Sequence, residues 1–104
     1  MHTQIANKAS AIADLCRRHG VSRLEVFGSA ARGTDFDPMA SDADFLVSFT
    51  PATRNDLGAY LDFKEALEAL LGRPVDLVER EAVEASRNSI RRRTILSSAA
   101  PLYG

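Results

Sequence analysis

Two aspartates separated by a single residue, Asp42 and Asp44, stand where a polar loop enters an apolar run. In a β-strand, residues two apart point to the same side, so this spacing predicts two carboxylates directed at one spot. Two such charges repel each other unless a cation lies between them. Mg²⁺ commonly binds one or two carboxylates and leaves its other positions to water and phosphate. The pattern therefore favours a strand, about residues 44–49, that carries a metal site.

A third aspartate, Asp76, lies in the middle of the apolar run 74–78. A lone carboxylate among Val and Leu residues is costly unless it has a partner. If this run forms a strand beside the one that carries Asp42 and Asp44, the three carboxylates form a single cluster. In that arrangement, we predict that Asp42, Asp44 and Asp76 are the ligands of one metal site.

The turn that precedes these acids has residues suited to phosphate. It follows the run 23–27, which alternates like a β-strand. Gly28 lets the backbone approach a ligand closely, and Ser29 can cap a short helix and offer a hydroxyl to phosphate. The N–H groups at a helix start favour an anion. Phosphate on one side and a metal on the other predict a nucleoside triphosphate site.

The role of Arg32, in the same turn, has two interpretations. Its guanidinium group could bind triphosphate oxygens, for which the planar fork of N–H donors is well suited. It could instead form a salt bridge with Asp35 or Asp37 in the next loop. The residues alone leave both open.

The order of these motifs resembles that of the DNA-polymerase-β-type nucleotidyltransferases: Gly28-Ser29, then Asp42-x-Asp44, then a single Asp76 on a later strand. The form Gly-Ser-x-Ala-Arg-Gly followed by Ser-Asp-x-Asp is similar to the minimal nucleotidyltransferase (MNT) domains. These are often the antitoxin half of HEPN–MNT toxin–antitoxin pairs. The resemblance extends from about residue 21 to residue 103, and it departs from the MNT pattern in a longer loop over residues 33–41.

The resemblance implies an α+β fold, a small mixed β-sheet of three or four strands with helices packed on one face, in a single domain over residues 1–104. It implies Mg²⁺, as two ions, and ATP as substrate, with AMP transferred to a hydroxyl. In the antitoxins that hydroxyl is a tyrosine of the partner HEPN toxin. It implies that Asp76 binds the metal ion nearest the attacking oxygen and helps to remove the proton from that oxygen. The implied catalytic residues are Asp42, Asp44 and Asp76. The implied nucleotide-binding residues are Gly28, Ser29, Arg32 and Ser41.

Two other functions are compatible with the same residues. A nucleotidyltransferase fold could neutralise a HEPN ribonuclease by binding alone, or the chain could modify a small molecule or an RNA end together with another subunit. A chain of 104 residues leaves little room for recognising an acceptor, and this favours a protein acceptor that brings its own surface. The intact set of three acids favours catalysis over binding alone.

Composition limits the remaining possibilities. The apolar content of 45% and charged content of 26% are typical of a globular protein. A net charge of −1 gives no indication of nucleic-acid binding. A single cysteine excludes an intrachain disulfide and fits a reducing cytosol. No apolar stretch approaches the roughly 20 residues that span a bilayer, and the N-terminus lacks the pattern of a signal peptide. We therefore expect a cytoplasmic protein.

Apolar periodicity predicts two long helices. The first covers residues 3–18, buries Cys16 as an inert thiol and ends at Gly20. The second starts at an Asn55 cap and ends at Gly72, before a strand over 75–78. Its aromatic residues are interpreted as core packing rather than as an adenine-binding site.

The C-terminal part gives weaker signals. A helix capped by Asn88 or Ser89 and an edge strand over 101–103 are expected. The basic run 91–93 has three open interpretations: a solvated helix face, a triphosphate contact, or a docking patch for an acidic surface.

Overall fold

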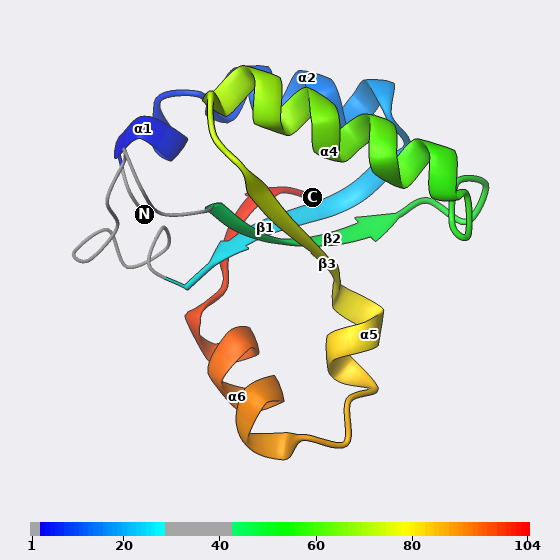
Figure 1. Cartoon of the computed structure of the whole chain (residues 1–104), viewed down its shortest axis with the longest axis vertical. Coiled ribbons are helices and arrows are strands. Elements are labelled where there is room, and N and C mark those ends of the chain that lie inside the picture. The colour runs from blue at the N-terminus through cyan, green and yellow to red at the C-terminus, as the bar shows by residue number, and fades with distance from the viewer. Residues whose placement is uncertain (1–2, 29–42) are drawn as a thin grey trace.

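A four-stranded mixed sheet forms the centre of the computed structural model, which describes residues 3–28 and 43–104 (Figure 1). The strands lie in the order β3-β2-β1-β4. β1 (Val21–Phe27) pairs antiparallel with β2 (Ala43–Phe49) and with β4 (Ala100–Tyr103). β2 pairs parallel with β3 (Val75–Glu79). The predicted α+β fold with a small mixed sheet is confirmed, including the edge strand at the C-terminus.

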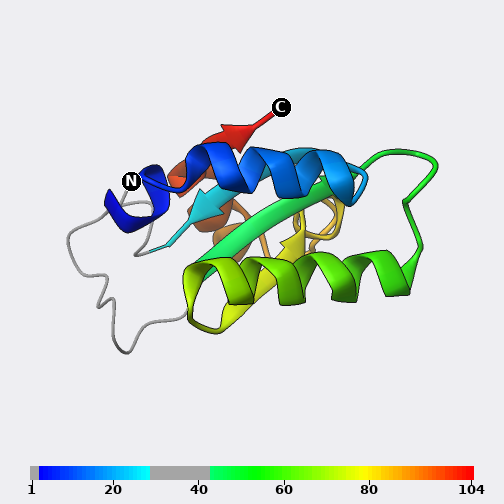
Figure 2. The same cartoon turned by 90° about the horizontal axis from the view of Figure 1, so that it is seen from above.

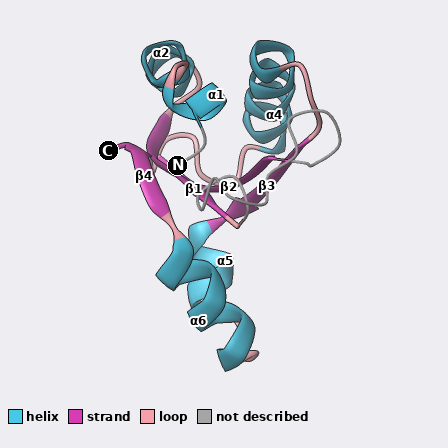
Figure 3. Cartoon of the chain, turned by 90° about the vertical axis from the view of Figure 1, so that its left-hand side faces the viewer, coloured by secondary structure: helices cyan, strands magenta, loops and turns pink. Residues whose placement is uncertain are grey.

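Helices cover both faces of this sheet. α1 (Thr3–Ala6), α2 (Ala9–Arg18) and α4 (Leu57–Leu71) lie on one face, where the two long helices run side by side (Figure 2). The sequence predicted this layer. α5 (Arg80–Glu84) and α6 (Ser89–Ser98) lie on the opposite side (Figure 3). None of the helices in these described ranges is long and apolar enough to cross a membrane.

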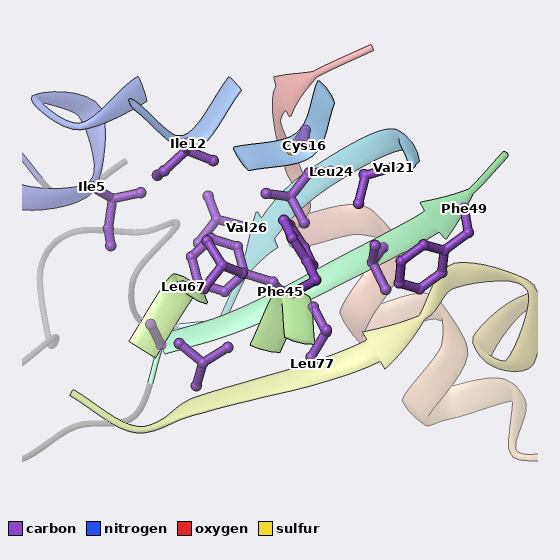
Figure 4. Close-up of a cluster of buried hydrophobic side chains, with 14 residues drawn as sticks. Ile5, Ile12, Cys16, Val21, Leu24, Val26, Phe45, Phe49, Leu67 and Leu77 are labelled. Carbon is purple, nitrogen blue, oxygen red and sulfur yellow. The ribbon is translucent and has the colours of Figure 1, made fainter. Parts of the chain in front are cut away.

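The main core fills the space between the sheet and the long helices (Figure 4). Alternate residues of the strands, such as Leu24, Phe45 and Leu77, point into it. Burying each such side chain stabilises the fold by ~1.5–3 kcal/mol. Cys16 is fully buried here, and burial raises the pKa of its thiol to about 12, in agreement with the predicted inert role.

A second, smaller core lies on the other face of the sheet. It joins Phe27 and Leu46 from the two central strands to Val83 of α5 and Ile95 of α6. β2 is therefore buried on both faces except at Asp44, which is half-buried. Because the helices on this face are short, the sequence periodicity did not predict that they would complete a second layer.

The first predicted helix is divided into α1 and α2 by the turn at Asn7 and Lys8. The Lys8 side chain has no capping hydrogen bond to α2. Its Nζ atom instead donates a hydrogen bond of 3.1 Å to the carbonyl of Leu70, near the end of α4. This long-range contact, which no local pattern reveals, accompanies the break.

The N-terminal cap of α4 is Asp56 rather than the predicted Asn55. The Asp56 carboxylate accepts a hydrogen bond of 3.1 Å from the Ala59 N–H group, as a cap should. Asn55 has φ of 73°, in the left-handed region that Asn tolerates better than most residues. Gly72, at the other end, has φ of 67° and ends the helix as predicted.

Replacing Gly72 by alanine tests this helix end. A Cβ atom at Gly72 would meet nothing within 4 Å, so the left-handed φ is the main source of strain. We expect Gly72→Ala to lower the free energy of unfolding by ~1–2 kcal/mol, measured by urea denaturation. Gly72→Asn should lower it by less, because Asn adopts this φ more easily. An equal loss for both variants would contradict the conformational explanation.

Candidate active site

Asp44 and Asp76 lie directly opposite each other on the parallel strands β2 and β3. Adjacent strands are ~4.8 Å apart, and residues in register point to the same face. The next pair along, Phe45 and Leu77, is buried in the core beneath α2 and α4. Because side chains alternate, Asp44 and Asp76 both point to the opposite face, so the structure brings these two predicted residues together.

The two acids differ in exposure. Asp44 is half-buried and its backbone faces Phe27 on β1, whereas Asp76 is exposed. We predicted a costly carboxylate inside an apolar run, and this was wrong for Asp76. Its neighbours Val75 and Leu77 point to the core, and the alternation directs Asp76 to solvent.

Gly28 packs against the Asp44 carboxylate. It follows β1 with φ of 70°, a conformation that L-residues rarely adopt. A Cβ atom at this position would lie 2.8 Å from Oδ2 of Asp44. The close approach predicted for Gly28 is therefore made to a candidate metal ligand, while its approach to phosphate stays a prediction.

Four predicted site residues lie outside the described ranges: Ser29, Arg32, Ser41 and Asp42. The two interpretations of Arg32 therefore stay open. Within residues 3–28 and 43–104, no group of three or more His, Cys, Asp or Glu side chains could hold a metal ion. The Asp44–Asp76 pair needs Asp42 to complete the predicted cluster, and that cluster stays a prediction.

Sequence reasoning missed a buried ion pair on the same face of the sheet. Glu25, in the middle of β1, is buried and accepts a hydrogen bond from the guanidinium group of Arg80. Nε of Arg23 lies 3.2 Å from the same Glu25 oxygen. Arg80 begins α5 directly after β3, so the pair connects β1 to this segment across β2. Breaking such a pair by removing one partner typically costs 3–5 kcal/mol.

The aromatic residues of α4 have structural partners, as predicted. Phe63 is fully buried and its ring meets that of Phe49 edge-on, with 6.3 Å between centroids. The Tyr60 hydroxyl donates a hydrogen bond to the carbonyl of Leu77. Burial raises the pKa of Tyr60 above its usual value, and Asp76 and Glu79 raise it further. The interpretation as core packing accounts for both rings.

The model of the nucleotidyltransferase domain family matches residues 9–98. This chain belongs to that family. It is 39% identical over 72 residues to the protein adenylyltransferase MntA of Thermococcus cleftensis, a match that covers 69% of each chain. The match supports the resemblance inferred from the Gly-Ser turn and the Asp-x-Asp motif.

Two solved structures share this architecture. One, assigned to the minimal nucleotidyltransferases, has a TM-score of 0.74 and 35% identity, covering 97% of this chain and 96% of the other. The second is a tri-AMPylated HEPN toxin of Shewanella oneidensis in complex with an MNT antitoxin. Its matching chain has a TM-score of 0.62 and 19% identity, covering 95% of this chain and 71% of the other, and it supports the fold alone.

A double-mutant cycle tests the contact between Gly28 and Asp44. We expect Gly28→Ala to lower the free energy of unfolding by more than the ~1–2 kcal/mol of left-handed strain, because the methyl group displaces the Asp44 carboxylate. In an Asp44→Ala background the cost should fall to the strain alone. Urea denaturation of the four proteins measures the coupling. Strictly additive losses would show that the two residues do not interact.

Proposed function

We propose that this chain is an Mg²⁺-dependent protein adenylyltransferase that transfers AMP from ATP to a hydroxyl, a tyrosine of a partner HEPN toxin, and so acts as its antitoxin. The observation that carries the proposal is the register that places Asp44 beside Asp76 on one face of the sheet. The 39% identity to a protein adenylyltransferase supports the reaction type. A chain of similar fold is found in a complex with a tri-AMPylated HEPN toxin, and this complex suggests the acceptor that we propose.

The described residues fit a divalent metal. Two carboxylates in register repel each other, and a hard cation between them relieves this repulsion. Gly28 leaves the space beside Asp44 that any side chain would fill. Asp44 and Asp76, with Asp42, would hold the ions. When bound, Mg²⁺ would stabilise negative charge on the attacking and leaving oxygens.

The protein's own residues would orient the reaction. The Gly28–Ser29 backbone and the side chains of Ser29, Arg32 and Ser41 would bind the β- and γ-phosphates. The acceptor hydroxyl would attack the α-phosphorus, and the bond from that phosphorus to the bridging oxygen would break. Pyrophosphate leaves and AMP stays on the acceptor. Asp76, which is exposed on the open side of the pair, would take up the hydroxyl proton.

In this proposal residues 1–104 form one domain that acts in the cytoplasm, and the acceptor protein contributes to its own recognition. Binding alone is the main competing mechanism for an antitoxin. The two mechanisms differ in a measurable product, because only catalysis leaves an adenylyl group on the partner.

Replacing Asp76 by asparagine separates catalysis from binding. Asp76 is exposed and outside both cores, so Asp76→Asn should remain folded and should still bind the partner. Loss of a metal ligand and proton acceptor should reduce AMP transfer at least ~100-fold. The partner to be tested is the HEPN protein encoded by a neighbouring gene. Intact-mass spectrometry of this partner, after incubation with ATP and Mg²⁺, measures the added adenylyl mass.

Glu79→Gln is the matched control, because Glu79 is an exposed acid at the other end of the same strand. This control should transfer AMP at the wild-type rate. If the wild type adds no mass to the partner yet neutralises it, and Asp76→Asn neutralises it equally well, the catalytic proposal is wrong. Neutralisation by binding alone would then replace it.

Metal and nucleotide should stabilise the fold together. We expect Mg²⁺ plus ATP to raise the melting temperature by more than the sum of the two separate effects, since each ligand completes the site of the other. In Asp42→Ala/Asp44→Ala this synergy should vanish. Differential scanning fluorimetry measures it, and synergy retained in the double variant would place the metal elsewhere.

A further inference from the structure

The start of α6 combines an exposed apolar side chain with positive charge. The side chain of Asn88 caps the helix through a hydrogen bond of 3.0 Å from the Arg91 N–H group. Ile90 is 80% exposed, and Arg91 and Arg93 are exposed beside it. Arg92 differs, since it is half-buried and donates a hydrogen bond to the carbonyl of Ser86.

This arrangement is unfavourable for an isolated chain. The N-terminus of a helix carries a partial positive charge, and cations near it are destabilising by a few tenths of a kcal/mol or more. The first turn of α6 contains no acidic residue to compensate. Arg91 and Arg93 form no ion pair with any other described residue. An acidic surface with an apolar centre would place negative charge near the helix start, pair with the two arginines and bury Ile90.

The chain carries such a surface at the carboxyl ends of β2 and β3. A pocket of about 410 Å³ opens there between the start of α4 and α5. Its apolar walls include Leu57, Tyr60 and Leu77, and its acidic residues are Asp56 and Glu79. A smaller hollow beside it shares Glu79 and adds further charges from Arg54 and Glu81.

This pocket is separate from the candidate active site. Asp76 and Glu79 are three residues apart on β3, which corresponds to roughly 10 Å. The exposure of Leu57 is 69% and that of Leu61, one turn further along α4, is 47%. Together with Ile90, these are the large apolar side chains that the described part of the chain leaves exposed.

We propose that the start of α6 in one copy of this chain docks into the α4–α5 pocket of a second copy. Ile90 enters the apolar centre beside Leu57, and Arg91 and Arg93 pair with Glu79 and Glu81. Within one chain this contact cannot form, because the start of α6 lies at the far end of the molecule from α4 (Figure 1). The contact uses no residue of the proposed active site, so it holds or fails independently of the proposed function.

Sedimentation equilibrium of the purified chain tests the contact at the apolar centre. The wild type should self-associate with a Kd below about 1 mM. Ile90→Asp and Leu57→Asp should each weaken association at least ~10-fold, because each places a charge in the apolar centre. Ala69→Asp, on an exposed position near the end of α4, is the matched control and should leave association unchanged. Circular dichroism checks that each variant is folded.

Exchanging the charges of the two proposed contact surfaces tests whether the start of α6 faces the acidic residues of the pocket. Arg91→Glu/Arg93→Glu and Glu79→Arg/Glu81→Arg should each be monomeric alone, since like charges then face each other. An equimolar mixture of the two should associate again, because each pocket meets a helix start of opposite charge. A monomeric wild type at about 1 mM, or a mixture that stays monomeric while the wild type associates, would overturn the proposal.

Discussion

The parallel pairing of β2 with β3 is the constraint on which the candidate site depends. The pair Phe45–Leu77 lies one step from Asp44–Asp76 and is buried in the main core. A slip of β3 by one residue would turn Leu77 out and Asp76 in. Repulsion between two close carboxylates costs ~1–4 kcal/mol, depending on their solvation. The fourteen buried residues of the main core contribute far more, so packing on one face fixes the acids on the other.

The face of the sheet opposite the main core carries both a structural ion pair and the candidate active site. Glu25 is buried there, and the guanidinium groups of Arg80 and Arg23 both contact its Oε1 atom, so no buried side-chain atom in the described residues is left unsatisfied. The small core around Phe27 and Leu46 then lies next to Asp44. This cluster supports Asp44 from the side and leaves Asp76 open to solvent. Under the proposed function, the acceptor would reach Asp76 from this open side.

Local patterns predicted most of the fold, and the failures have physical causes. The sequence predicted that Asp44 and Asp76 would meet if their strands were neighbours, and the pairing of β2 with β3 fulfils that condition. Asn55 and Asp56 are both residue types that cap helices well. In the structure Asp56 has the extended backbone of a cap, whereas Asn55 has a left-handed φ. The Glu25–Arg80 pair spans 55 residues, and no spacing rule reaches that far. The contributions of Ser29, Arg32, Ser41 and Asp42 stay predictions, because they lie outside the described residues.

The charged residues of this chain differ in the neighbours that surround them. Where a charge is structural, as at Glu25, opposite charges of the same chain enclose it. At the candidate site, the residue in register with Asp44 on the neighbouring strand β3 is a second acid, Asp76. Arg91 stands in the first turn of α6, where positive charge is least favourable. Departures from local sequence rules often mark sites that act on other molecules. The proposed metal site at Asp44 and Asp76 and the proposed docking of the start of α6 are both departures of this kind.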